Sequence, residues 1–166
     1  YQDLAGLSII EHVYQVAKKV SNDNIIFVTN QNNNIELKNL FPKAKFVIQK
    51  KQKGTADAIL QAKKYLKNSD ILILFADVPL ITIKSIKKLI LNFKKNNSTG
   101  SMIAFKTENP FGYGRVVTDG KNVSDVVEEL NTSNTQKKIK LCNSGVMLCN
   151  SKLLFANISK ISDKNF

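Results

Sequence analysis

The first half of the chain alternates between short apolar runs and amphipathic segments. From Leu7 to Val20, apolar residues recur at helical spacing, which predicts an amphipathic helix. Three continuous apolar runs bounded by polar residues are typical of buried parallel strands. The predicted order after the first helix is strand 25–29, helix 35–40, strand 45–49, helix 54–66, strand 70–75 and helix 82–94. Strands that alternate with helices predict right-handed βαβ units and a parallel sheet.

Beyond Gly100 the pattern changes, because strands follow one another with little helix between them. The predicted strands are 101–106, 115–118, 123–128 and 140–149. Asp119-Gly120 is a hairpin-type turn signal, and the polar residues 133–138 indicate an exposed loop or one helical turn. The pattern therefore predicts an α/β domain whose second half is mixed and partly antiparallel.

Composition is consistent with one globular domain. The chain has 166 residues, the size of an ordinary domain, and its hydrophobic fraction of 43% is enough for a core. No apolar run approaches the ~20 residues that span a bilayer, so we expect no membrane insertion, and no secretory signal pattern opens the chain. The first residue is not Met, and the chain opens in the run-up to a helix, so we expect a missing N-terminal segment.

The chain is strongly basic, with a formal net charge of +12 and a pI near 9.7. Such a charge can indicate a nucleic-acid or anionic-membrane partner. However, Arg115 is the only arginine, and the abundance of Lys, Asn and Ile is what AT-rich codon usage produces. Proteins that grip phosphates bidentately tend to use Arg, and no aromatic residues interleave with Lys as in a stacking platform. We therefore predict no nucleic-acid partner, and a basic polyanion binder is kept as an alternative.

The two cysteines, Cys142 and Cys149, are seven residues apart. On one strand their side chains would point to opposite faces, which argues against a disulfide and against a shared metal site. Two buried thiols in a reducing cytosol are the interpretation that fits best, and this indicates a cytoplasmic protein.

The third predicted strand ends in Phe75-Ala76-Asp77-Val78-Pro79-Leu80. In open α/β sheets, ligands bind just beyond the carboxyl ends of the strands. A carboxylate at this place is well sited for a Mg²⁺ ion that is bound to phosphates. The alternative is that Asp77 caps the next helix, but Thr82 is better placed for that cap. We therefore predict a functional role for Asp77.

A second candidate segment, residues 49–58, lies between a strand end and a helix start. Gly54 would let a ligand approach the backbone closely, and the helix N-terminus offers free N–H groups. Gln49 and Gln52 can each donate and accept hydrogen bonds, which suits a nucleobase edge. The alternative is a plain helix cap by Thr55.

Two further candidate segments lie in the second half. Residues 111–115 read Phe-Gly-Tyr-Gly-Arg and could form a tight loop against a sugar ring. Arg115 would then be available for a structural or ligand carboxylate or phosphate; the alternative is the start of a hairpin with a solvated Arg. Glu128 ends an alternating strand, and Asn143 interrupts an apolar one, where a buried amide needs partners. Sugar hydroxyls and an N-acetyl group could be those partners, and a backbone bulge is the alternative.

In this order, the segments resemble the uridylyltransferase domain of the bacterial bifunctional N-acetylglucosamine-1-phosphate uridylyltransferase / glucosamine-1-phosphate acetyltransferases. The family pattern is Q-x-x-Q-x-G-T-x-x-A, then a strand ending in G-D-x-P-L, then G-Y-G-R, V-E and N-T-G. The matching residues are Gln49, Gln52, Gly54, Thr55 and Ala58, then Asp77, Pro79 and Leu80, then Gly112, Tyr113, Gly114 and Arg115, then Val127 and Glu128, then Asn143, Ser144 and Gly145. Each motif is modest alone, whereas the ordered set is specific and runs nearly end to end.

The resemblance implies a Rossmann-like nucleotidyltransferase fold, a mixed and mostly parallel sheet with helices on both faces. It implies transfer of UMP from UTP to N-acetylglucosamine 1-phosphate, which gives UDP-N-acetylglucosamine for cell-wall precursors and releases pyrophosphate. Asp77 would be the catalytic residue and would hold Mg²⁺. The implied substrate-binding residues are Gln49, Gly54 and Thr55 near uracil, Phe75 and Ala76 beside the metal, and Gly114, Glu128 and Asn143 around the amino sugar.

This sequence departs from the family pattern at the metal strand. Ala76 stands for the family's glycine, and Phe75 stands for its tyrosine, which removes one hydroxyl. The family's Gly-rich loop and first strand would lie upstream of Tyr1, and a second metal ligand, an Asn, would lie beyond Phe166. We therefore expect residues 1–166 to be a partial nucleotidyltransferase domain that is inactive alone. The resemblance also implies a C-terminal acetyltransferase half through which the full-length protein is homotrimeric.

Two other functions remain open from the sequence. One is a different nucleotidyltransferase that uses another sugar 1-phosphate or a cofactor such as molybdopterin. The other is a nucleotide-binding regulatory module that has lost catalysis.

Overall fold

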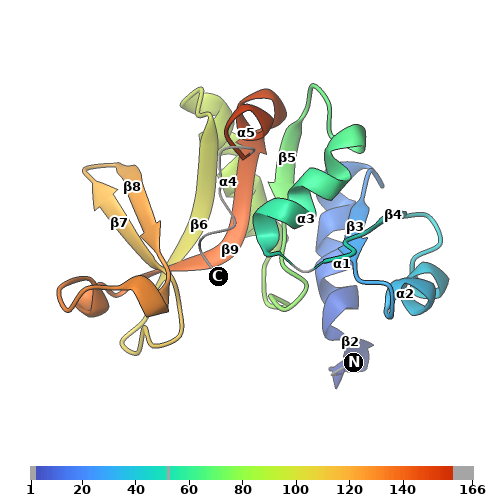
Figure 1. The fold of residues 1–166 in the computed structure, drawn as a ribbon, viewed down its shortest axis with the longest axis horizontal. Coiled ribbons are helices and arrows are strands. Elements are labelled where there is room, and N and C mark those ends of the chain that lie inside the picture. Colours follow the sequence, from blue (N-terminus) through green and yellow to red (C-terminus); the bar gives the residue numbers. More distant parts are fainter. Residues whose placement is uncertain (1–2, 52, 159–166) are drawn as a thin grey trace.

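The computed structural model describes residues 3–51 and 53–158 of the chain (Figure 1). Its strands are β1 (Asp3–Leu4), β2 (Leu7–Ser8), β3 (Ile26–Thr29), β4 (Lys45–Ile48), β5 (Asp70–Ile73), β6 (Gly100–Lys106), β7 (Arg115–Asp119), β8 (Asn122–Val127) and β9 (Leu141–Asn150). Its α-helices are α1 (Ile9–Ser21), α2 (Asn34–Leu40), α3 (Thr55–Ala62), α4 (Ile83–Lys95) and α5 (Ser151–Ile158). Short 3₁₀ turns are η1 (Lys63–Tyr65), η2 (Glu129–Asn131) and η3 (Gln136–Lys138). The α/β class and the order of the predicted elements are confirmed. The strands β1 and β2 and the helix α5 were not predicted, and the helix predicted from Leu7 begins at Ile9.

The strands form separate sheets. β3 and β4 pair in parallel, β1 and β2 make a small antiparallel pair, and a five-stranded sheet has the order β5-β9-β7-β8 with β6 also on β9. Every pairing in the five-stranded sheet is antiparallel. The pairings therefore differ from the expected mostly parallel sheet, because β5 takes the late strand β9 as its partner instead of β3.

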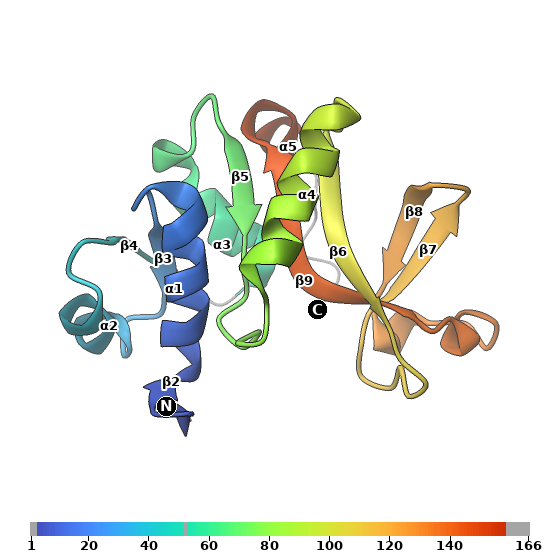
Figure 2. The ribbon, with the colours of Figure 1, turned by 180° about the vertical axis from the view of Figure 1, so that it is seen from behind.

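Helices cover both sides of this arrangement, as the resemblance implies. α3 and α5 lie on one side in Figure 1, and α1 and α4 lie on the other side in Figure 2. α1 packs against α4, and α3 packs against α5. The hairpin β7–β8 projects from this body, and its turn contains Gly120 with φ +59°, which confirms the predicted turn.

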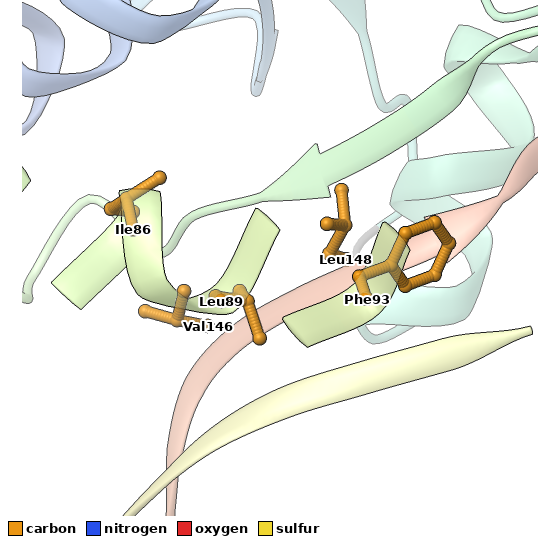
Figure 3. Close-up of a cluster of buried hydrophobic side chains, with 5 residues drawn as sticks. All are labelled: Ile86, Leu89, Phe93, Val146 and Leu148. Carbon is orange, nitrogen blue, oxygen red and sulfur yellow. The ribbon is translucent and has the colours of Figure 1, made fainter. Parts of the chain in front are cut away.

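The main core lies between α4 and β9. Figure 3 shows Ile86, Leu89 and Phe93 of α4 against Val146 and Leu148 of β9. The helical residues are spaced three and four apart, so they share one face. Full burial of one such side chain contributes about 1.5–3 kcal/mol. This packing fixes β9, which carries part of the candidate site.

An aromatic cluster holds the smaller parallel sheet against α1. The ring centroids of Tyr14 and Phe41 are 4.4 Å apart, those of Phe27 and Phe41 are 5.0 Å apart, and those of Phe27 and Phe46 are 5.2 Å apart. Tyr14 lies on α1, Phe27 on β3 and Phe46 on β4, so the rings join three elements. The end of β4, and with it the loop that follows, is positioned by this cluster.

A groove of about 1200 Å³ separates β3 from β5. Apolar residues of both strands line it, together with residues of α1 and α3. Among the described strands, β3 has only β4 as a partner and β5 has only β9, so the edges that face the groove have no strand beside them. The groove is therefore a cleft within the fold, and its rim carries the first half of the candidate site.

Candidate active site

The end of β4 and the start of α3 bring Gln49 next to Gly54. Gln49 Nε2 donates to the carbonyl of Gly54 at 3.1 Å and to Asp57 Oδ2 at 2.7 Å. Gly54 has φ +89°, a conformation that favours glycine, and Thr55 is the first residue of α3. No side chain caps this helix, so the alternative of a Thr55 cap is wrong. Gln52 lies outside the described residues.

The chain leaves β5 through Phe75, Ala76 and Asp77. Phe75 is half-buried, whereas Ala76 and Asp77 are exposed. All three line the groove that Gln49, Gly54 and Thr55 also line. The structure thus brings the six predicted residues of the first half together at one cleft.

Asp77 does not cap α4. The Thr82 side chain accepts a hydrogen bond from the Ser85 amide at 3.1 Å, as predicted for the N-cap. Within residues 3–51 and 53–158, the Asp77 carboxylate has neither a hydrogen-bond partner nor a salt-bridge partner. An exposed carboxylate without a structural bond is available to a ligand.

The remaining predicted residues form a second cluster around Gly114. The backbone N–H of Asn143 donates to the carbonyl of Gly114 at 2.9 Å. A Cβ on Gly114 would lie 3.2 Å from Oε1 and 3.3 Å from Oε2 of Glu128, so the missing side chain lets the carboxylate approach the backbone. Gly114 is buried and Glu128 is exposed. β7, β8 and β9 therefore bring Gly114, Glu128 and Asn143 together.

The bulge alternative for Asn143 is also present in the structure. The pairing of β6 with β9 shifts register between Met102 and Ala104, opposite residues 143–147. The Asn143 side chain accepts a hydrogen bond from the Gly145 amide at 2.8 Å, which orients the side-chain amide group. This bulge therefore fixes the Asn143 side chain.

Arg115 is a buried ion-pair partner, and the alternative of a solvated Arg is wrong. Its side chain is 2% exposed, and Nη1 lies 2.7 Å from Glu129 Oε2. The same nitrogen donates to the carbonyl of Tyr113. The hydrogen bond from Arg115 holds the pKa of Glu129 below its usual value, and a hydrogen bond from the Gly112 amide acts in the same direction. Sequence reasoning assigned no role to Glu129; the single arginine beside a glycine loop was the signal for an acidic partner.

The two clusters meet where Phe75 packs on Gly145. Gly145 has φ +77°, and a Cβ at this position would lie 2.6 Å from Cδ2 of the Phe75 ring. Such a distance is far below contact, so only glycine admits the ring here. The segment that carries Asp77 therefore rests on the strand that carries Asn143.

Both thiols are free, as the spacing predicted. Cys142 is buried and Cys149 is half-buried, and burial raises the pKa of each thiol. Cys142 lies opposite Arg115 in the pairing of β7 with β9.

A family model described as nucleotidyl transferase matches residues 3–165. The chain belongs to the nucleotidyl transferase family. It is also similar to the bifunctional protein GlmU of Buchnera aphidicola subsp. Schizaphis graminum, with 41% identity over 164 residues, which is 98% of this chain and 35% of that protein. These matches confirm the resemblance drawn from the motifs. The chain spans about a third of the length of the curated relatives it matches.

Solved structures of other nucleotidyl transferases share the fold. A UDP-glucose pyrophosphorylase complexed with UDP-glucose has a TM-score of 0.72 and 14% identity, and the match covers 95% of this chain and 69% of that one. A CMP:2-keto-3-deoxy-manno-octonic acid synthetase complexed with CTP has a TM-score of 0.74 and 15% identity, with 97% and 70% covered. At these identities the likeness concerns the fold, and it confirms the predicted nucleotidyltransferase architecture.

Nucleotidyl transferases generally use a divalent metal, and the site fits one in a particular way. Across the described residues, no three His, Cys, Asp or Glu side chains come close enough to hold an ion. Mg²⁺ is commonly held by one or two carboxylates together with substrate phosphates and waters. Asp77 is exposed and has no hydrogen bond or ion pair to any other described residue, so it suits such a shared site.

None of the helices in the described part of the chain has the length and apolarity needed to cross a membrane.

Proposed function

We propose that this domain transfers UMP from UTP to N-acetylglucosamine 1-phosphate, giving UDP-N-acetylglucosamine and pyrophosphate. The observation that carries the proposal is the contact between Phe75 and Gly145. It joins the rim of the groove, with Asp77, to the cluster of Gly114, Glu128 and Asn143. A nucleotide on one side of Asp77 and a sugar phosphate on the other would bring their phosphates together at that carboxylate.

In this proposal the residues of the groove rim bind and orient the nucleotide. Gln49 is held by its bonds to Gly54 and Asp57, so its amide group is fixed before a ligand arrives. The backbone at Gly54 is open to close approach because glycine has no side chain. Thr55 begins α3, whose first N–H groups suit electronegative ligand atoms.

The second cluster would orient the amino sugar. The Glu128 carboxylate accepts hydrogen bonds from hydroxyl groups, and the Asn143 side chain offers an amide to the N-acetyl group. The sugar phosphate oxygen would then attack the α-phosphorus of UTP in line with the departing pyrophosphate. In such a reaction the protein mainly positions its substrates, and effective positioning can supply about 7–11 kcal/mol of the barrier.

Asp77 would hold Mg²⁺ together with the phosphate oxygens. When bound, the ion neutralises charge on the phosphates. We assign the metal role to Asp77 because the described residues offer no competing structural partner for this carboxylate.

The same proposal treats residues 1–166 as part of a larger nucleotidyltransferase domain. The groove between the unpaired edges of β3 and β5 supports it, as does the coverage of only about a third of the relatives. One further strand in the groove could bond both edges and cover its apolar lining. On this proposal the isolated chain is inactive, and the full gene product works in the cytoplasm as a homotrimer with an acetyltransferase half.

The test is pyrophosphate release by the full gene product with Mg²⁺, UTP and N-acetylglucosamine 1-phosphate. We expect release with this pair and much less with UTP and glucose 1-phosphate. Pyrophosphate release with UTP and glucose 1-phosphate, and none with UTP and N-acetylglucosamine 1-phosphate, would overturn the choice of sugar. Nucleotide binding without turnover of either pair would favour a regulatory module, and nucleic-acid binding that survives physiological salt would favour a polyanion binder.

A further inference from the structure

We propose that Arg115 and Glu129 are positioning residues for the sugar phosphate. Their ion pair determines how tightly the protein binds that substrate. The inference rests on the proposed function, because it assigns Gly114, Glu128 and Asn143 to the sugar side. Neither Arg115 nor Glu129 is expected to touch the substrate. They act by fixing the backbone at Gly114 and the Glu128 carboxylate, which are proposed to contact the sugar phosphate.

Arg115 is buried and Glu129 is half-buried, so a contact that served stability alone would be costly for the arginine. The Arg115 side chain is 2% exposed, that of Glu129 is 21% exposed, and the charged atoms are 2.7 Å apart. Arg115 Nε is buried, and no hydrogen-bond partner lies within reach among the described residues. Desolvation offsets much of the attraction in a buried pair, and apolar residues of similar volume are often as stable. A pair kept under these conditions is explained better by the geometry it imposes.

That geometry is a clip on the glycine loop. Glu129 Oε2 accepts hydrogen bonds from the Gly112 amide at 3.2 Å and from Arg115. Arg115 in turn donates to the carbonyl of Tyr113. One carboxylate oxygen therefore holds both ends of the segment 112–115.

The clip reaches the sugar side through three short steps. Gly114 lies inside the clipped segment, and its carbonyl accepts a hydrogen bond from the backbone N–H of Asn143 at 2.9 Å. Glu128 is the chain neighbour of Glu129, and its carboxylate lies against Gly114. If the pair is broken, the loop can move relative to Glu128. The residues Gly114, Glu128 and Asn143 are then no longer held in fixed positions relative to one another.

The chain offers a matched control in the neighbouring ion pair of Lys140 and Glu108. Its side chains are 56% and 88% exposed, and it lies at the edge of β9 and the loop after β6. It has the same charges but is solvated and holds none of the residues proposed to bind the sugar. Exposed pairs contribute little to stability.

The experiment compares variants of the full gene product in steady-state assays. In Glu129→Gln we expect the KM for N-acetylglucosamine 1-phosphate to rise about tenfold or more, because small misplacements of binding groups are costly. The KM for UTP should stay within about twofold, because the residues proposed to bind the nucleotide lie at the groove rim, on the other side of Asp77 from this ion pair. Glu108→Gln should change neither constant.

A double variant separates positioning from stability. Arg115→Met with Glu129→Leu replaces the pair by apolar groups and is expected to fold with a melting temperature near that of the wild type. The positioning role predicts a raised KM for the sugar phosphate in this stable protein. A wild-type KM in the double variant would overturn the inference, as would equal rises in both KM values.

The outcome for the proposed function is read separately. Wild-type turnover with an unchanged KM in the variants defeats only the positioning role. If the wild type uses another sugar 1-phosphate, the proposed substrate fails, and the KM for that sugar phosphate becomes the readout. If it turns over none, amide exchange decides: faster exchange at Gly112 and Asn143 in Glu129→Gln, and not in Glu108→Gln, supports the clip, and equal exchange overturns it.

Discussion

The two halves of the candidate site are built in opposite ways. The groove rim around Asp77 is exposed, and the Asp77 carboxylate makes no bond within the described residues. The cluster around Gly114 is held by the ion pair of the buried Arg115 with Glu129, by the β7–β8 hairpin and by a backbone bond from β9. The difference teaches that the protein leaves the proposed metal ligand, Asp77, free and fixes the surface proposed to recognise the sugar.

This contrast has a physical reason. A metal shared with phosphates arrives with a mobile substrate, so its carboxylate must be free of competing bonds. Recognition of a sugar depends on several hydrogen bonds whose directions must be set in advance. The largest effects should therefore come from removing the free carboxylate, and smaller ones from loosening the fixed cluster.

Asp77→Ala should have the largest effect. We expect Mg²⁺-dependent turnover of the full gene product to fall about a thousandfold or more, because metal stabilisation is worth several kcal/mol and about 1.4 kcal/mol is tenfold. The melting temperature should not change, because Asp77 makes no hydrogen bond or ion pair within the described part of the chain. Asp119→Ala, at the exposed tip of the β7–β8 hairpin, is the control and should keep full turnover. Near-normal turnover in Asp77→Ala would exclude the metal role.

Gly145→Ala tests the contact that joins the two halves. The new Cβ would meet the Phe75 ring at 2.6 Å, and φ +77° is unfavourable for alanine. We expect a loss of about 1–3 kcal/mol in the free energy of unfolding and about a hundredfold loss of turnover, since Asp77 is displaced. Urea denaturation and the pyrophosphate assay measure the two effects.

Gly120→Ala is the matched control for that variant. Gly120 has φ +59°, and nothing lies within 4 Å of its Cβ position. It therefore adds backbone strain without a clash, and we expect a smaller loss of stability and normal turnover. Equal losses of turnover in the two variants would mean that the Phe75 contact has no special role.

Gln49→Ala should have a smaller effect, confined to the groove rim. It removes bonds to the Gly54 carbonyl and to Asp57, and each is worth about 0.5–1.5 kcal/mol. We expect the KM for UTP to rise severalfold and the KM for the sugar phosphate to stay constant, the mirror image of Glu129→Gln. Gln61→Ala, which removes the other amide bound to Asp57, is the control and should leave both constants unchanged. A rise in the KM for the sugar phosphate would contradict the assignment of the groove rim to the nucleotide alone.

The smallest expected effect is a pH dependence of stability from Glu129. Its folded-state pKa lies below the unfolded value because Arg115 donates a hydrogen bond to it. The contribution of ionised Glu129 to the free energy of unfolding is therefore complete above its unfolded-state pKa of about 4.3. It is lost as the pH falls through the folded-state pKa. The stability difference between wild type and Glu129→Gln, from urea midpoints, should be constant near neutral pH and shrink in the acid range. A constant difference down to about pH 3 would contradict the lowered pKa.

Local patterns predicted most of the elements and the position of the candidate residue Asp77 at a strand end. The spacing of Ile86, Leu89 and Phe93 marked one face of α4, and that face is the core. The apolar run before Asp77 marked a strand end, and the structure has β5 there. Thr82 was predicted as the cap and is the cap. These features depend on neighbours a few residues away, so the sequence contains them directly.

Pairings between distant segments were less accessible. The pattern predicted parallel strands, and β5 instead pairs with β9. In this pairing Ile71 lies opposite Cys149, 78 residues further along the chain. Residues 25–29 and 70–75 are equally apolar, and apolar composition does not specify which strand pairs with which. The partner of a strand is chosen by the whole set of strands and helices, through burial and hydrogen bonding of every edge.

By itself, then, the sequence determined the α/β class, the positions of most elements, the family resemblance and the place of Asp77 at the end of a strand. Only the tertiary structure decided that Arg115 is buried against Glu129, that Phe75 rests on Gly145, and that a groove divides the strands. The first group follows from short-range periodicity and motif order. The second depends on which side chains are brought together from distant parts of the chain, and such proximity exists only after the chain has folded.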